Sequence, residues 1–226
     1  MQLNDILGVI IVYAYVAFLL VLTEKWLSKK DTMVSRKLLH IMVGNIAFLL
    51  PLFVTREIMA FVAAAPFIVL TYLISPFSPF KKVRDRLSKT GHGLGLVYYA
   101  IAWTVLAYVF FDHKEIIAMG ILAMSYGDGF ASILGIKYGR KTYKIFSDRK
   151  SYIGSISMFL FTILLLEIAL LYYQVPTQLL TFPMLLVLAG VATLTEGLTP
   201  KGLDNLSVPF VVAVLYWYFQ YYLGVM

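Results

Sequence analysis

An acidic side chain, Asp128, stands within a long apolar run that covers residues 116–136. On insertion scales an ionised carboxylate at membrane depth costs roughly 2.5–3.5 kcal/mol, so such a residue needs a partner or a function. Gly127 and Gly129 flank it, and two glycines around a buried acid predict a broken or closely approached helix. Membrane transporters and enzymes build ion sites at such places. We therefore expect Asp128 to be functional; a purely structural tie to a neighbouring helix is the alternative.

A second group of polar residues lies in a short turn near the end of the chain. Glu196 and Asp204 stand at the two ends of this turn, and Asn205 follows directly. Oxygen ligands suit Mg²⁺, which proteins usually hold with one or two carboxylates together with substrate phosphates. We predict that Asp128, Glu196 and Asp204 bind the metal ion. Asp128 and Asp204 are also the candidates for the base that takes a proton from an attacking hydroxyl.

Basic residues gather between these two acidic groups and can neutralise a polyphosphate. Ser151 and Gly154 predict a capped helix N-terminus, whose free N–H groups favour phosphate; a capped helix after a positively charged loop is the simpler alternative. Small residues at 127, 131, 135 and 139 share one helical face, which permits either close helix packing or the approach of a ligand. The residues predicted to bind a nucleotide are Gly127, Gly135, Gly139, Arg140, Lys141, Lys144, Lys150, Ser151, Gly154 and Asn205.

A Walker A phosphate loop is not predicted, although one string approaches its pattern. The string Gly135-x-x-x-Gly139-Arg140-Lys141-Thr142 is one residue too short and carries an additional arginine. No strand is expected before it, whereas a Walker A loop joins a strand to a helix. Phosphate binding in this segment therefore requires a different arrangement of donors.

His40 lies one helical turn inside the apolar run 38–54. Arg36 precedes it by four residues, which places both on one face of a helix that enters the membrane. A lone histidine in such a position often has only a structural hydrogen-bonding role. We predict a catalytic role for His40, close to the hydroxyl group that attacks the phosphate.

Membrane helices must position these residues. The 226-residue chain is 61% hydrophobic and 14% charged, with a mean hydropathy of +0.83, whereas soluble domains are roughly 45–50% apolar and about 25% charged. These values exclude a soluble globular protein, a disordered tail and a coiled coil, and the absence of cysteine excludes disulfides and thiolate sites. We predict an all-α, polytopic helical bundle that forms one domain, 1–226. Its eight expected spans are 6–22, 38–54, 58–74, 94–111, 116–136, 152–173, 177–195 and 206–223.

The basic residues predict how the bundle is oriented. Seventeen of the nineteen Lys and Arg residues fall in four alternate loops, at 23–37, 75–93, 137–151 and 196–205. Because such residues are retained on the cytoplasmic side, we expect these loops and the candidate site to face the cytoplasm and both termini to lie opposite. The net charge of +7 follows from this topology. Nucleic-acid binding is not expected, since no folded module presents these bases together.

Three strings of the sequence resemble signatures of the CTP-dependent polyprenol kinases, a family that includes dolichol, phytol and farnesol kinases and the yeast-type CTP-dependent diacylglycerol kinases. The strings are Arg36-Lys37-x-x-His40, then Asp128-x-x-Ala131-x-x-x-Gly135-x-x-x-Gly139 with Arg149-Lys150-Ser151-x-x-Gly154, and Asp204-Asn205-Leu206-x-Val208-Pro209. The resemblance covers residues 36–210. It implies that 128–155 binds CTP phosphates and Mg²⁺ and that Asp204 and Asn205 complete the site. Ile153 stands where the family has a glutamate, which removes one acid.

The resemblance implies an integral membrane kinase that uses Mg²⁺ to transfer the γ-phosphoryl group of CTP to an isoprenoid alcohol, such as phytol, geranylgeraniol or dolichol. Three alternatives stay open. A CDP-lipid synthase carries similar strings, and a CTP-dependent diacylglycerol kinase differs in its acceptor. An ion-coupled transporter would use Asp128 at a broken helix. The sequence also leaves open whether the chain acts as a monomer or as a homodimer.

Overall fold

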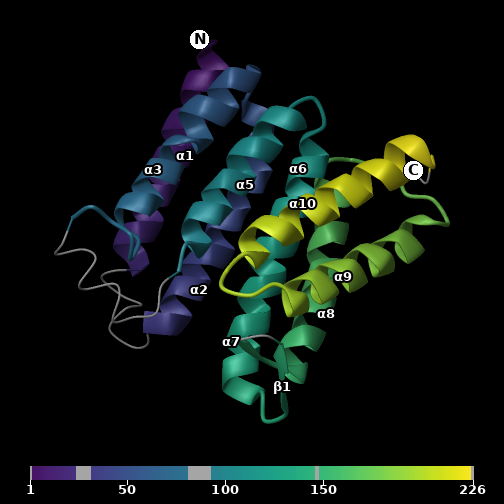
Figure 1. The fold of residues 1–226 in the computed structure, drawn as a ribbon. Coiled ribbons are helices and arrows are strands. Elements are labelled where there is room, and N and C mark those ends of the chain that lie inside the picture. The colour runs from purple at the N-terminus through teal and green to yellow at the C-terminus, as the bar shows by residue number, and fades with distance from the viewer. Residues whose placement is uncertain (1, 24–31, 81–92, 146–147, 225–226) are drawn as a thin grey trace.

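The computed structural model describes residues 2–23, 32–80, 93–145 and 148–224 (Figure 1). Helices cover the apolar runs, and several change pitch along their length without a break in the chain direction. The helical elements are α1 (Leu3–Leu22), α2 (Thr32–Val43) with the 3₁₀ helix η2 (Gly44–Leu52), the π-helix η3 (Ile58–Ala64), α3 (Pro66–Leu73), α5 (Gly95–Val109), α6 (Lys114–Leu122), the π-helix η4 (Ala123–Asp128), α7 (Gly129–Tyr138), α8 (Tyr152–Tyr172), α9 (Thr181–Leu198), α10 (Asp204–Trp217) and the π-helix η5 (Tyr218–Tyr222).

Four helical stretches in the described part of the chain are long and apolar enough to cross a membrane, by length and composition. They are Leu3–Leu22, Lys114–Tyr138, Tyr152–Tyr172 and Thr181–Leu198. Three further apolar stretches, Lys37–Leu52, Ile58–Leu73 and Gly95–Val109, are shorter. A helical bundle with four candidate membrane-spanning helices in its described part is thereby confirmed. The count of eight spans and the side on which the termini lie stay predictions.

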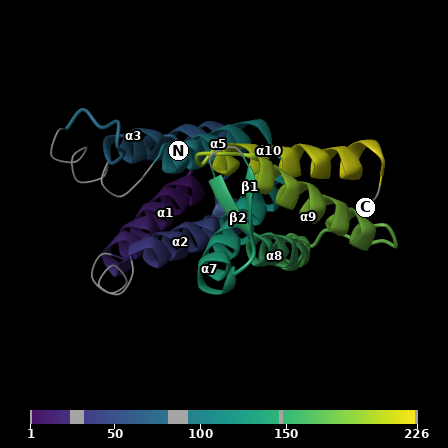
Figure 2. The same ribbon diagram turned by 60° about the horizontal axis from the view of Figure 1, so that its bottom comes forward.

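The basic segment 137–151, expected to be a loop, contains the one departure from an all-helical chain among the described residues. Strands β1 (Thr142–Ile145) and β2 (Asp148–Ser151) pair antiparallel, with Thr142 opposite Ser151 and Ile145 opposite Asp148. β2 contacts α7 and α8. The hydroxyl groups of Tyr143 and Ser155 lie 2.7 Å apart, which fixes the hairpin to the first turn of α8. Figure 2 shows the hairpin lying across one end of the bundle.

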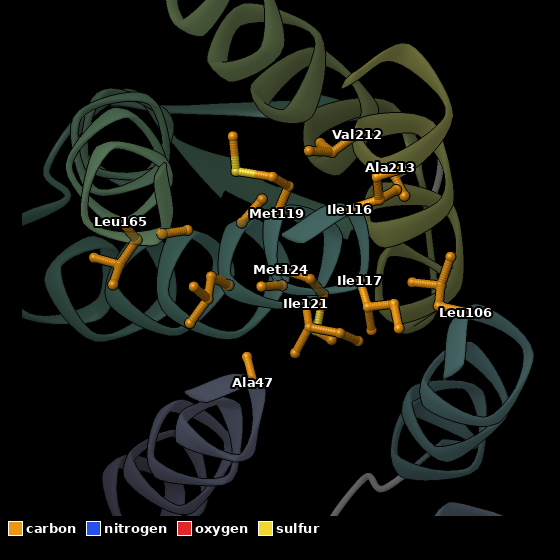
Figure 3. Close-up of a cluster of buried hydrophobic side chains, with 14 of the residues drawn as sticks. Ala47, Leu106, Ile116, Ile117, Met119, Ile121, Met124, Leu165, Val212 and Ala213 are labelled. Carbon is orange, nitrogen blue, oxygen red and sulfur yellow. The ribbon is translucent and has the colours of Figure 1, made fainter. Parts of the chain in front are cut away.

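The helix formed by α6, η4 and α7 runs through the centre of the bundle. In its most apolar window 78% of the residues are buried, against 22% in α1. The side chains of Ile116, Ile117 and Met119 have no exposed surface, and they pack with residues of α5, α8, α10 and η2 (Figure 3). Asp128 ends η4, so the central helix carries it from the core towards the end that bears the hairpin.

Gly120 allows the central helix to approach α10 closely. A Cβ atom at this position would overlap the backbone carbonyl oxygen of Pro209, and Ala213 Cβ would lie 3.2 Å away. Backbone atoms cannot move aside as a flexible side chain can, so a larger residue here must separate the two helices. The spacing of α6 and α10 thus depends on glycine, and with it the position of Asp204 at the start of α10.

We expect Gly120→Ala to destabilise the protein, because overpacking typically costs about 1–3 kcal/mol. For a chain of this size each kcal/mol lowers the unfolding midpoint by roughly 2–4 °C. The midpoint can be measured for detergent-solubilised protein by thermal unfolding. Gly190→Ala is the matched control: a Cβ there meets nothing within 4 Å, and alanine favours a helix over glycine. Equal midpoints for the two variants would contradict the close approach.

Candidate active site

Three carboxylates from separate parts of the chain meet at the end of the bundle that carries the hairpin. Asp128 ends η4, Glu196 lies near the end of α9, and Asp204 is the first residue of α10. One oxygen from each lies within 4.8 Å of the others. The three residues are 3%, 4% and 9% exposed. Buried carboxylate oxygens at this spacing suit a hard cation such as Mg²⁺, and the sequence predicted these three residues as its ligands.

The sequence around Asp128 produces a closely approached helix but not a broken one. Residues 123–128 form a π-helical segment within an otherwise continuous helix, a feature that is frequent at functional sites. A Cβ at Gly127 would lie 2.6 Å from both Met158 Sδ and Thr162 Oγ1 of α8. A Cβ at Gly129 would overlap Ile41 of α2. The two glycines therefore let α2 and α8 pack tightly on either side of Asp128.

The turn between α9 and α10 brings Asp204 to the cluster. Lys201 and Gly202 have positive φ angles of 56° and 79°, the conformation in which glycine is least strained. The Gly202 carbonyl accepts hydrogen bonds from the backbone N–H and the side-chain amide of Asn205, at 3.3 and 3.2 Å. The last expected span began at residue 206; the helix starts at Asp204, because this turn already ends at Leu203.

Two lysines bind the three carboxylates directly. Lys37 Nζ lies 2.7 Å from Asp128 Oδ2. Lys150 Nζ donates to a carboxylate oxygen of Glu196 and lies 3.5 Å from Asp204 Oδ2. It also donates to the Glu196 backbone carbonyl at 3.1 Å. Each acid that could hold a metal ion is thus paired with an ammonium group, which offsets the cost of burying it.

The pKa values of Asp204 and Lys150, which lie outside the expected spans, reflect this crowding. Burial raises the pKa of Asp204 to about 6, and the carboxylate of Asp128 adds to the rise, while Lys150 opposes it. Burial by itself would lower the pKa of Lys150, but the carboxylates of Glu196 and Asp204 outweigh it and raise that pKa. Lys150 is therefore a firmly charged cation. Asp204 needs more positive charge nearby to stay ionised at low pH.

A cavity of about 410 Å³ opens beside the carboxylates, within the usual range for ligand pockets of roughly 300–1,000 Å³. Eight of the predicted site residues line it: Asp128, Gly135, Lys150, Ser151, Gly154, Glu196, Asp204 and Asn205. Ser151 caps α8, since its Oγ accepts the Gly154 N–H at 3.0 Å. The side-chain oxygen of Asn205 has no hydrogen-bond partner. The cavity thus combines acids, a lysine and a capped helix N-terminus.

Other predicted nucleotide ligands lie outside this lining. Gly127 packs against α8, and a Cβ at Gly139 would overlap the Gly135 carbonyl and the Ser151 side chain. The small-residue face therefore serves helix packing at these two positions. The side chains of Arg140, Lys141 and Lys144 are exposed around the hairpin, where they contribute positive charge at the rim.

His40 lies behind Asp128, on the side of α2. It is 7% exposed, and its Nε2 atom faces Asp128 Oδ2 at 3.8 Å without a hydrogen-bond partner. Its ring packs on Tyr99, with centroids 4.6 Å apart, and forms a hydrogen bond with the backbone of Met124. Because Nε2 has no partner, we assign this bond to Nδ1, which leaves Nε2 as a buried acceptor that points towards the carboxylate.

Eight cavity residues were not singled out from the sequence as site residues, among them Lys37, Ser132 and Arg149. Ser132 Oγ donates to Asp128 Oδ1 at 3.3 Å. A signal for Lys37 was present, because it precedes His40 by three residues and so lies on the same helical face. The predicted span began at residue 38 and left Lys37 among the loop residues, whereas α2 begins at Thr32.

Comparisons with known proteins find relatives over most of the chain. It is 33% identical to a phytol kinase of Synechocystis sp., over 84% of this chain and 81% of that protein. It is 35% identical to phytol kinase 1, chloroplastic, of Arabidopsis thaliana, over 85% and 69%, and 34% identical to a probable phytol kinase 1 of Oryza sativa, over 77% and 60%. No model of a protein family matches the chain, and no solved structure matches it. The sequence similarity nevertheless shows that the chain belongs to the phytol kinase family.

Proposed function

We propose that this protein is an isoprenoid alcohol kinase that uses Mg²⁺ and CTP and acts on phytol or a similar alcohol. The observation that carries the proposal is the meeting of Asp128, Glu196 and Asp204 beside a cavity that two lysines also line. The names of the relatives support an alcohol acceptor. Phosphoryl transfer needs little covalent chemistry from the protein and depends on positioning and charge neutralisation, which this set of residues can supply.

The carboxylates of Asp128, Glu196 and Asp204 would hold the metal ion. Bound there, Mg²⁺ supplies charge neutralisation at the phosphate oxygens. Lys150 and Arg149 line the same cavity and would contact the phosphates from the side of the hairpin. The N-terminus of α8, capped by Ser151, would add backbone N–H donors. Arg140, Lys141 and Lys144 would act at longer range, by attracting the nucleotide to the rim.

His40 would act as the base for the hydroxyl of the alcohol, in place of Asp128 and Asp204, which would bind the metal ion. Its free Nε2 atom is a hydrogen-bond acceptor, so the hydroxyl can donate to it and present its oxygen to the γ-phosphorus. As the oxygen–phosphorus bond forms and the bond to the departing nucleoside diphosphate breaks, the hydroxyl proton passes to Nε2. The resulting imidazolium would lie 3.8 Å from the Asp128 carboxylate, which stabilises the positive charge. Asp128 thus links the acceptor to the metal ion.

A matrix of nucleotides against alcohols tests the proposal. Purified protein should phosphorylate phytol or geranylgeraniol with CTP and Mg²⁺ and release CDP. A cytidylyltransferase would release pyrophosphate, and a diacylglycerol kinase would prefer diacylglycerol as acceptor. Product analysis by mass spectrometry separates these outcomes. A faster reaction with ATP would refute the choice of nucleotide and leave the alcohol kinase standing; no alcohol-dependent turnover with any nucleotide would refute the kinase itself.

Asp128→Asn and Asp204→Asn should each lower kcat/KM by about 100-fold or more. Mutation of residues that only hydrogen-bond to metal ligands already lowers activity by about 10–100-fold. Each change keeps the shape of the side chain and removes its charge. Asp112→Asn is the control, because Asp112 pairs with Arg56 away from the cluster and is largely exposed. Initial rates at varied Mg²⁺ provide the measurement. Activity of either site variant close to that of the control would refute the metal assignment.

His40→Gln should lower kcat by about 100-fold, the low end of the effect of a general base, with a smaller change in the KM for CTP. Glutamine preserves polarity but cannot accept the proton. His113→Gln serves as the matched control, because His113 is an exposed histidine that contacts Tyr221 and Glu115. A loss confined to the KM for CTP would place His40 at the nucleotide, and no loss at all would leave it a structural residue.

A further inference from the structure

The lysines of the site contact the same carboxylates that would bind the metal ion. Lys37 binds Asp128, and Lys150 binds Glu196 and approaches Asp204. Here every carboxylate in the candidate metal cluster already interacts with an ammonium group. The following inference rests on the proposed function, because it assigns roles to these lysines within that site.

A divalent cation and these ammonium groups compete for the same oxygens. The cluster carries three acids and two lysines, so one negative charge remains when both lysines are bound. Adding Mg²⁺ would bring four positive charges against three negative ones into a buried site. That arrangement is unfavourable unless the lysines leave or further negative charge arrives. A triphosphate supplies the negative charge and offers the lysines new partners.

The lysines have room to exchange partners. The side chains of Lys37 and Lys150 are 31% and 19% exposed, and both residues line the cavity. A lysine has a flexible four-carbon stem and a point charge, so it can turn from a carboxylate to a phosphate oxygen without movement of the backbone. The carboxylates, in contrast, are 9% exposed or less and belong to packed helices.

Two unpaired acceptors indicate that the lysines do not complete the site. The Nε2 atom of His40 is more than nine-tenths buried, has no hydrogen-bond partner and faces Asp128 Oδ2. The side-chain oxygen of Asn205 also lacks a partner. Buried acceptors without donors cost free energy. The cluster is therefore prepared for donors or cations beyond those that Lys37 and Lys150 provide.

We infer that Lys37 and Lys150 act as an exchangeable lock on the metal site. They neutralise the carboxylates when the nucleotide is absent and pass to its phosphates when the metal–nucleotide complex binds. Metal ion and nucleotide then bind cooperatively, and by thermodynamic linkage each raises the affinity for the other by the same factor. Premature binding of a metal ion alone is weak, and Lys37 is a phosphate-binding residue of the loaded site.

The test measures binding of Mn²⁺, a spectroscopic substitute for Mg²⁺, to the detergent-solubilised full chain by electron paramagnetic resonance. Lys37→Gln should bind Mn²⁺ about tenfold more tightly than the wild type when no nucleotide is present, because a competing cation is lost. A non-hydrolysable CTP analogue should raise the Mn²⁺ affinity of the wild type at least about fivefold, a typical lower bound for coupling between sites. The same analogue should raise that of Lys37→Gln less.

Lys137→Gln is the matched control. It removes the same charge from α7, where Lys137 is exposed and contacts the ring of Tyr138 rather than the carboxylates. Its Mn²⁺ affinity should stay within about twofold of the wild type, which corrects for the general effect of lost positive charge. Lys37→Arg keeps the charge and should retain weak metal binding. Thermal unfolding with and without Mn²⁺ checks that each variant is folded; Lys150→Gln replaces Lys37→Gln if the latter does not fold.

Several outcomes overturn the inference. Equal or weaker Mn²⁺ binding by Lys37→Gln would assign the lysine a purely structural role, and so would independent binding of Mn²⁺ and the nucleotide analogue to the wild type. Failure of every form to bind Mn²⁺ overturns it as well. A different result would refute the proposed function alone. If metal ion and nucleotide bind cooperatively but no alcohol is phosphorylated, the role of the two lysines stands and the kinase activity is refuted.

Discussion

The central constraint in this molecule is the burial of three carboxylates within a few ångströms of one another in a largely apolar bundle. Desolvation and mutual repulsion both disfavour such a cluster, and two lysines make it tenable. The lysines come from different elements, Lys37 from α2 and Lys150 from the hairpin. The site therefore forms only when α2, the central helix, the hairpin, α9 and α10 have all packed together. The charge of the cluster is balanced only when these elements of the fold have assembled.

The packing of the central helix explains why these groups can be held at short distances. Gly120 admits α10, Gly127 admits α8 and Gly129 admits α2, so three neighbouring helices pack closely against one helix between residues 120 and 129. A π-helical segment ends at Asp128, and such segments are frequent at functional sites. Glycine spacing, which in the sequence permitted either packing or ligand approach, mainly serves packing. The side chains that line the cavity lie mainly at the ends of the helices.

Much of this was visible in the sequence, and the limits have physical causes. Apolar runs predicted helices, and Asp128 inside one of them predicted a functional acid, because placing charge in an apolar medium is costly. The turn that holds Glu196 and Asp204 supplied the other two acids of the cluster. Pairing depends on three-dimensional proximity, so the Lys37–Asp128 contact, across 91 residues, left only a weak signal. The hairpin was missed because a short basic segment carries no alternating apolar pattern. Exposure of Arg140, Lys141 and Lys144 follows from that same hairpin.

The arrangement also explains how a water-soluble nucleotide and a lipid could react with each other. Residues suited to phosphate lie on the hairpin and at the start of α8, at the end of the bundle, whereas His40 lies on a helix that enters the apolar run. Asp128 contacts both sets, through Lys37 and the cavity on one side and through the 3.8 Å approach to His40 on the other. A hydroxyl that leads a long apolar chain would reach His40 from within the bundle, so its tail need not leave the lipid. In the proposed reaction, the acid that interrupts the apolar run would therefore lie between the nucleotide and the alcohol.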